Sequence, residues 1–281
     1  MKWFFCIFFI PNLLSSHLYN LTISTLFKNE ARWLKEWIEY HRFLGVQHFY
    51  LYSNDSTDNY EEVLSPYIKM GLVDLIEWNS DNAPFHDPRQ PIQWVGFQLS
   101  ALNDSIQRAK GIAQWIACID IDEYIFPVEG KESFQIFLKR TPLEVGSLRL
   151  SWQCFGTSYL KELSMNSLVT ESLVMRSRDD SHWNQHVKCI HRPEAIQYTL
   201  VHKAYLKNNY IFEFIDRSKF RLNHYIARGQ QEALIKRRGD LPTFEKLMNE
   251  VFDNSMNQYV PFIKKGIWFT KEDWWKKLEE K

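Results

Sequence analysis

Residues 21–54 predict a strand, a helix and a second strand, and this order constrains the fold more than any other feature of the chain. Apolar and β-branched residues alternate over 21–27, which is typical of a strand. Apolar residues then recur at helical spacing up to Leu44, and Gly45 can end the helix because glycine readily adopts left-handed backbone angles. Residues 46–52 form the second predicted strand. Two strands joined through a helix pair in parallel by a right-handed crossover, so we expect an α/β fold.

An acidic run, Asp120-Ile121-Asp122-Glu123, follows the apolar residues 115–119, which predict a buried strand. Alternate residues of an extended segment point the same way, so Asp120 and Asp122 can face one ligand. Carboxylate oxygens suit Mn²⁺ or Mg²⁺ carrying a diphosphate, and open α/β sheets bind ligands at the carboxyl ends of their strands. The run therefore predicts a metal site, although an isolated Asp-x-Asp also occurs in solvated turns.

Further motifs stand along the chain at Lys28-Asn29-Glu30, Leu34-Lys35-Glu36-Trp37, Gly45-Val46, residues 52–58, Gln98, Asn103, residues 115–127, Lys188-Cys189-Ile190-His191-Arg192-Pro193, Val201-His202, Asn223-His224-Tyr225, Lys236 and Arg238-Gly239. Their order and spacing over residues 21–240 resemble glycosyltransferase family 92. The resemblance implies a GT-A-like fold, which is a Rossmann-like mixed and mostly parallel sheet flanked by helices, in a single catalytic domain. It also implies a nucleoside-diphosphate sugar as donor, expected to be UDP-linked, and a divalent cation. The implied reaction is an inverting transfer of a galactose-like hexose to a glycan hydroxyl.

Polar residues at the ends of the first two predicted strands are candidates for the nucleotide site. Asn29 and Glu30 follow the first strand, and Asn54 and Asp55 follow the second, so we expect them to border the base or the ribose. Ordinary cap and turn chemistry explains these residue types equally well. Lys188 is the candidate contact to the diphosphate, with a solvent-facing strand position as the alternative.

The metal site and the proton transfer need further groups. A histidine from the second half often completes such a site, and His224 is the first choice and His202 the second, against a structural hydrogen-bonded role for either. An inverting reaction also needs a general base for the acceptor hydroxyl. Asp180 lies in a polar loop and is the first candidate, while Glu123 is its rival because it adjoins the metal site. A retaining reaction would not require this base.

The remaining elements follow from periodicity. Residues 73–78 predict a third strand, and residues 93–110, 133–139 and 242–251 predict helices. Residues 79–91, between the third predicted strand and the helix predicted at 93–110, are polar and contain prolines. They are a candidate lid over the donor.

The second half is expected to shape the acceptor site. Residues 145–155 and 168–176 predict strands. Trp152, Phe155 and Gly156 are the acceptor-side candidates, because an indole can stack on a sugar ring. Core packing explains Trp152 as well.

Composition supports a single globular enzyme. The 281 residues are 45% hydrophobic, which is enough for a substantial core. The formal net charge is zero, so we expect no nucleic-acid partner held by a basic surface. Cys154 and Cys189 could form a disulfide in an oxidising compartment, and the lack of a Cys-x-x-Cys pattern argues against structural zinc.

The two ends of the chain differ from its body. Residues 1–16 resemble a secretory signal peptide, because a short apolar run follows Lys2, and a hydrophobic first strand is the alternative. We therefore predict a leader over 1–16, a glycosyltransferase domain over 17–240 and a helical extension over 241–281 packed on it. The amphipathic residues 268–281 could instead touch a membrane surface. A leader implies the secretory pathway, a periplasm or a membrane-associated location, and its absence implies the cytoplasm.

Two other classes of function use the same residues. A metal-dependent nucleotidyl or phosphoryl transferase would need the same carboxylates, but the sequence has no glycine-rich phosphate loop. A noncatalytic sugar- or nucleotide-binding relative is the second alternative. The joint presence of Asp120, Asp122, Lys188 and His224 speaks against it.

Overall fold

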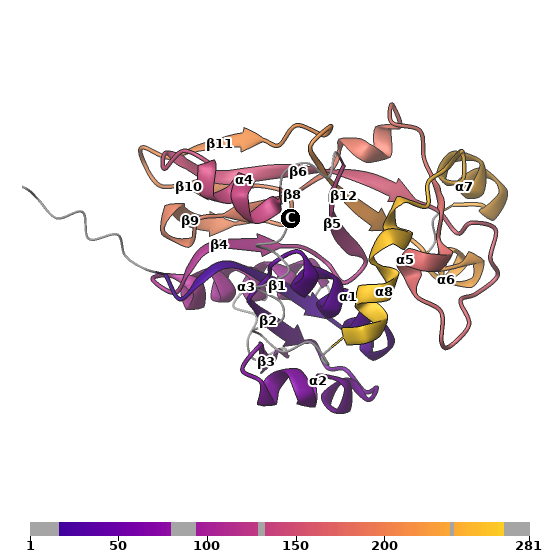
Figure 1. Ribbon diagram of the computed structural model, residues 1–281, viewed down its shortest axis with the longest axis horizontal. Helices are drawn as coiled ribbons and strands as arrows, with labels where there is room; N and C mark the ends of the chain where they lie inside the picture. The colour runs from indigo at the N-terminus through magenta and orange to yellow at the C-terminus, as the bar shows by residue number, and fades with distance from the viewer. Residues whose placement is uncertain (1–16, 80–93, 129–132, 237–238, 267–281) are drawn as a thin grey trace, which may run out of the picture.

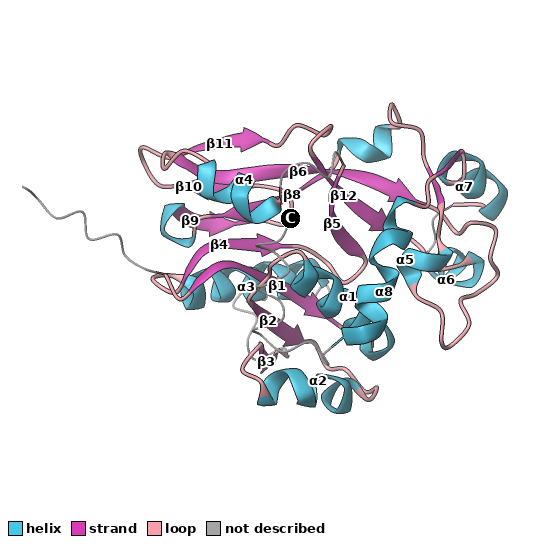
Figure 2. Cartoon of the chain, viewed as in Figure 1, coloured by secondary structure: helices cyan, strands magenta, loops and turns pink. Residues whose placement is uncertain are grey.

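The computed structural model describes residues 17–79, 94–128, 133–236 and 239–266, and builds from them a large mixed sheet flanked by helices (Figures 1 and 2). The elements of the first half are β1 (Tyr19–Phe27), α1 (Ala31–Phe43), β2 (His48–Ser53), α2 (Tyr60–Lys69), β3 (Val73–Glu77), α3 (Trp94–Ala109), β4 (Ala113–Cys118) and β5 (Glu123–Pro127). The α/β class that we predicted is confirmed.

The second half consists of α4 (Phe134–Arg140), β6 (Val145–Phe155), α5 (Val169–Ser172), β7 (Met175–Arg176), β8 (Val187–His191), β9 (Ile196–Thr199), β10 (Ala204–Leu206), β11 (Ile211–Phe214), β12 (Phe220–Tyr225), α6 (Gln230–Ile235), α7 (Leu241–Met248), β13 (Val251–Phe252) and α8 (Val260–Lys265). Short 3-10 turns occur at residues 182–185, 193–195 and 255–259. Figure 1 shows α2 at one end of the molecule and β11 at the other.

Four parallel strands in the order β4-β1-β2-β3 form the first half of the sheet. Helix α1 packs on one face, through a core that includes Trp37 and Ile38, because its apolar residues recur at helical spacing. Helix α3 packs on the other face through residues that include Leu102 and Ile106. Gly45 follows α1 with a φ of 98°, which confirms the predicted helix end. The carboxyl ends of β1, β2 and β4 therefore meet at one edge.

Strand β8 joins the two halves, because it pairs antiparallel with β4 on one side and with the long strand β6 on the other. Strand β12 then runs parallel to β6 and antiparallel to β5. The chain leaves β4 through residues 119–122 and enters β5, so this connection passes directly beside β12.

Two sequence predictions of local structure are wrong. Residues 120–122 are not extended but form a turn, in which the Glu123 amide donates a hydrogen bond to the Asp120 carbonyl at 3.1 Å. Residues 168–176 are not one strand, because α5 interrupts them. The buried Glu36 carboxylate accepts the Val169 and Thr170 amides, each at 2.8 Å, and this contact stabilises the first turn of α5.

The proposed disulfide between Cys154 and Cys189 does not form in the described part of the chain. Cys189 on β8 is paired in register with Arg149, which lies five residues from Cys154 along β6. A strand advances about 3.3 Å per residue, so about 16 Å of strand separates the two positions.

Within the described residues 239–266, the chain forms the helices α7 and α8 and the strand β13. Strand β13 pairs with β7, and α8 packs on α1 through the stacked Phe43 and Phe262 rings. The predicted leader at 1–16, the amphipathic residues 268–281 and nearly all of the predicted lid at 79–91 lie outside the described residues. No helix among the described residues is both long enough and apolar enough to cross a membrane.

Candidate functional site

Asp122 and His224 face each other where the β4–β5 turn passes β12. The Tyr225 amide donates to the Asp122 carbonyl at 2.8 Å, and His224 is paired in register with Glu123. This backbone pairing places Nε2 of His224 3.5 Å from Oδ1 of Asp122, with both side chains largely buried. Two residues about a hundred positions apart in the sequence thus form one carboxylate–imidazole pair.

Asp122 is ionised because cations surround it. The Lys236 ammonium lies 3.3 Å from its Oδ2, and the same ammonium is 2.8 Å from Oε1 of Glu232. Burial alone would raise the pKa of Asp122, but His224 and Lys236 outweigh burial and hold that pKa well below its usual value. The carboxylate therefore carries its charge at neutral pH.

Asp120 has different partners. Gln98 donates to its Oδ1 and Lys188 donates to its Oδ2, both at 2.7 Å. Lys188 is buried, so the alternative of a solvent-facing strand residue is wrong. Burial opposes its charge, but Asp120 and Glu123 outweigh burial and raise the pKa of Lys188 above its usual value. Asp120 is thus held by an amide and a permanent cation.

Glu123 lies beneath the turn and is fully buried. Its Oε2 accepts the Asp120 amide at 2.8 Å and is 3.5 Å from the Lys188 ammonium. Burial raises the pKa of Glu123 to about 8, against the opposing attraction of Lys188. The contacts of Glu123 with Asp120 and Lys188 stabilise the turn at residues 120–123.

Asp122 and His224 are the candidate ligands for a divalent cation that the structure brings together. Within the described ranges, no three His, Cys, Asp or Glu side chains come together as a ready metal site. Both Asp120 oxygens accept hydrogen bonds instead, from Gln98 and Lys188. Asp122 and His224 fit a cation that takes its other ligands from phosphate and water. Nδ1 of His202, the second choice, donates a hydrogen bond to the Val187 carbonyl at 2.8 Å.

The predicted nucleotide-side residues lie at the expected edge and stabilise its loops. Asn29 has a φ of 56°, and its side-chain oxygen accepts the Thr57 amide at 2.7 Å. Asn54 is buried and donates to the Trp78 carbonyl at 2.9 Å. Asp55 is exposed at a φ of 49°. The contacts connect the loops after β1, β2 and β3.

Trp152 is an acceptor-side candidate that contacts the Asp122–His224 pair. Its ring centroid lies 4.1 Å from that of His224, and the His186 ring stacks on it at 4.9 Å. Two imidazoles thus contact the indole, and Trp152 is partly buried against the core. Phe155 is fully buried, and Gly156 packs against the end of α7.

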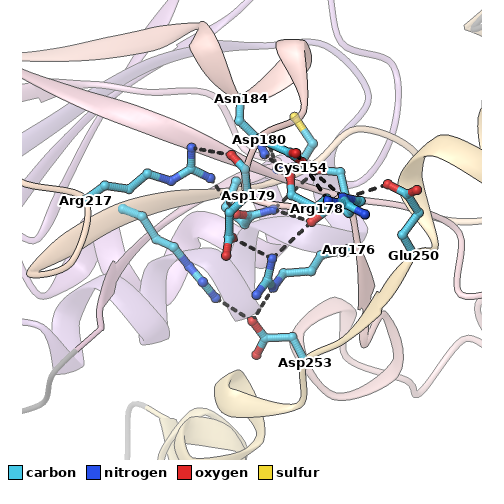
Figure 3. Close-up of polar contacts among 12 residues, drawn as sticks. Cys154, Arg176, Arg178, Asp179, Asp180, Asn184, Arg217, Glu250 and Asp253 are labelled. Atoms are coloured by element: carbon cyan, nitrogen blue, oxygen red, sulfur yellow. Dashed lines mark hydrogen bonds and ion pairs between the residues drawn. The ribbon is translucent and has the colours of Figure 1, made fainter.

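Asp180 lies in an arginine-rich group on the loop after β7 (Figure 3). Its side chain is 72% exposed and accepts from Nε of Arg178 at 3.1 Å. The neighbouring Asp179 pairs with Arg176. No hydrogen bond or ion pair among the described residues joins Asp180 to Asp122.

Comparison with known families decides the class of protein. A sequence profile described as glycosyltransferase family 92 matches residues 19–277. The chain belongs to glycosyltransferase family 92. The match includes both halves of the sheet and the Asp122–His224 pair, and it extends past residue 240.

Relatives of this family 92 chain occur in plants and animals. A family 92 protein of Ricinus communis is 28% identical over 76% of this chain and 37% of its own length. A family 92 protein of Oryza sativa subsp. japonica is also 28% identical, over 74% of this chain and 33% of its own length. A galactan beta-1,4-galactosyltransferase of Arabidopsis thaliana is 33% identical over 48% of this chain and 23% of its length. The chain thus spans about a third of the length of the curated relatives it matches first.

Similar solved structures are distant. TarS of S. aureus in complex with UDP-GlcNAc gives a TM-score of 0.42 at 10% identity, over 90% of this chain and 74% of that one. Glucosyl-3-phosphoglycerate synthase from Mycobacterium tuberculosis gives 0.33 at 16% identity, over 63% and 58% of the two chains.

Arg228 belongs to the site of this family 92 chain, although sequence reasoning assigned it no role. Its Nη1 donates to Oε2 of Glu30 at 2.7 Å, its guanidinium lies 4.9 Å from the Trp33 ring centroid, and its side chain is 3% exposed. Its amide also donates to Glu232. The one feature of the sequence that could have pointed to Arg228 is its position shortly after a predicted buried strand. The roles of Gln98 and Lys236 depend equally on contacts that the sequence does not display.

Proposed function

We propose that the chain is a metal-dependent GT-A-type glycosyltransferase that moves a hexose from a nucleoside-diphosphate sugar to a glycan hydroxyl. The observation that carries this proposal is the Asp122–His224 pair at the carboxyl edge of the parallel strands, where its carboxylate is held ionised. Membership of family 92 supports the reaction class.

The transfer builds negative charge on the departing diphosphate, and the site is arranged to balance it. Asp122 and His224 would hold Mn²⁺ or Mg²⁺, which supplies positive charge to the diphosphate when bound. Lys188 keeps Asp120 and the turn in place, as its contacts with Asp120 and Glu123 indicate. The residues of this chain thus hold the turn that carries Asp122 in place before the donor arrives.

The proposed donor is a UDP-linked, galactose-like hexose, because a relative bears the name galactan beta-1,4-galactosyltransferase. The loops that carry Asn29 and Asn54 would border the nucleotide. For an inverting reaction, Asp180 is the candidate base that an acceptor can reach, since its side chain is exposed whereas Glu123 is fully buried.

The test is a calorimetric titration of the full chain with UDP, with and without Mn²⁺, and then with GDP. We expect Mn²⁺-dependent UDP binding that is lost in Asp122→Asn. The matched control is Glu171→Gln, because Glu171 is a half-exposed carboxylate that pairs with Lys264 away from the site. Folded protein that binds neither nucleotide would overturn the proposal and favour a noncatalytic relative. Binding that persists in Asp122→Asn would overturn the metal assignment.

A further inference from the structure

Lys236 pairs with Asp122, the carboxylate that would bind the cation. Its ammonium lies 3.3 Å from Oδ2 of Asp122, and His224 lies 3.5 Å from Oδ1. His224 is a proposed ligand of the cation, so a cation held between Oδ1 and Nε2 would share the Asp122 carboxylate with the Lys236 ammonium on Oδ2. The two positive charges repel each other at such short range.

Lys236 also has a second carboxylate partner, Glu232. It follows Glu232 by four residues at the end of α6, and the two side chains pair at 2.8 Å. The Ile226 carbonyl accepts from the same ammonium at 3.3 Å. A lysine on a flexible four-carbon stem can therefore leave Asp122 without becoming an unpaired charge.

Lys236 keeps a carboxylate partner when it leaves Asp122, because Oε1 of Glu232 lies 2.8 Å from its ammonium. An ammonium beside the cation site would lie close to the diphosphate oxygens of a bound donor. Lysine binds phosphate readily as a compact point charge.

We propose that Lys236 and the divalent cation compete for Asp122, and that Lys236, displaced towards Glu232 as the cation binds, then pairs with the diphosphate of the donor. This inference rests on the proposed function, because it needs both a cation and a nucleotide at the site. It assigns Lys236 two opposite effects: it weakens binding of the cation alone and strengthens binding of the donor.

The deciding experiment follows Lys236 itself. The full chain is treated briefly with an amine-acetylating reagent, and the acetylation rate of each lysine is read by peptide mass spectrometry. Adding Mn²⁺ alone should raise the rate at Lys236, because the ammonium loses its contact with Asp122, and adding UDP as well should lower it. Lys264, a half-exposed lysine paired with Glu171, is the internal control and should not respond. An unchanged or lower rate at Lys236 with Mn²⁺ alone would overturn the proposal.

A variant gives the second measurement. Lys236→Met should bind Mn²⁺ about tenfold more tightly by calorimetry, and should bind UDP about tenfold more weakly at saturating Mn²⁺. Lys264→Met should change neither affinity. Weaker or equal Mn²⁺ binding by Lys236→Met overturns the competition. If the unaltered chain binds no Mn²⁺ at all, the proposed function fails together with this inference, whereas Mn²⁺ binding with an unresponsive Lys236 overturns this inference alone.

Discussion

The Lys188 ammonium lies 2.7 Å from Oδ2 of Asp120, and its side chain is 2% exposed. Removing one partner of a buried pair leaves the other charge without compensation, which typically costs 3–5 kcal/mol. We expect Lys188→Met to lower the free energy of unfolding by about 3 kcal/mol, the lower end, because Asp120 keeps a third of its side chain exposed. Urea unfolding measures this change.

Two further variants check that the Lys188 effect comes from the pair. Asp120→Asn combined with Lys188→Met should recover part of the loss, because it removes the uncompensated carboxylate as well. Lys264→Met breaks a half-exposed pair and should cost at most about 1 kcal/mol. Equal losses in the single and the double variant would argue against a charge-pair explanation.

Glu123 should make stability fall as the pH rises. Burial raises its pKa from 4.5 to about 8, so between these pH values the folded state keeps a proton that the unfolded state has released. The contribution is fully present below about pH 4.5 and is lost as the pH rises through about 8. Urea unfolding with a chelator present gives the free energy of unfolding at each pH. In Glu123→Gln this free energy should depend less on pH than in the unaltered chain. Glu171→Gln should leave the pH dependence as it is, and a slope shared by all three proteins would rule Glu123 out as its source.

Replacing Arg228 should lower the free energy of unfolding more than replacing an exposed arginine. Its side chain is 3% exposed and pairs with Glu30, so Arg228→Gln leaves a carboxylate uncompensated and should cost about 3 kcal/mol. Arg228→Lys keeps the charge and should recover part of this loss. Arg178→Gln, which removes an exposed pair with Asp180, should not change the unfolding midpoint measurably. Similar midpoints for Arg228→Gln and Arg178→Gln would contradict the buried pairing.

Two glycines should respond to alanine in opposite directions. A Cβ at Gly156 would collide with the Asn249 side chain and lie 2.7 Å from Cβ of Met248, so Gly156→Ala should cost about 1–3 kcal/mol. Gly96 lies in helix α3, and apart from its chain neighbours and the helix's own backbone no described atom lies within 4 Å of a built Cβ, so Gly96→Ala should stabilise the protein by about 0.5–1 kcal/mol. Thermal unfolding distinguishes the two signs. A rise in the unfolding temperature with Gly156→Ala would contradict the close packing at Gly156, and a fall with Gly96→Ala would contradict the open space at Gly96.

Local pattern was enough to predict the first half of the fold. The alternation in β1, the helical spacing in α1 and the left-handed Gly45 are all encoded within 27 residues, and Asp120 lies at the predicted edge because parallel strands end together. The short helix α5 was missed because its first turn is capped by Glu36, a residue 133 positions away. Local propensity cannot register such a distant contact.

The site was predictable in its residue types but not in their partners. Asp122 and His224 were both candidates from sequence, and the structure places them together. Whether Asp120 would join them depended on the turn at Glu123 and on the register of β8, which presents Lys188 to it. Neither feature has a local signature, and for the same reason Arg228 was not foreseen.

The ion pair between Lys236 and Asp122 spans 114 residues, and that between Arg228 and Glu30 spans 198. At the usual speed of translation, 5–20 residues per second, a ribosome takes roughly 6 to 23 s to add Lys236 after Asp122. During that interval the nascent chain presents the Asp122 carboxylate before its own lysine exists. Asp122 therefore has neither of its two side-chain partners, His224 and Lys236, until the second half of the sheet has been synthesised.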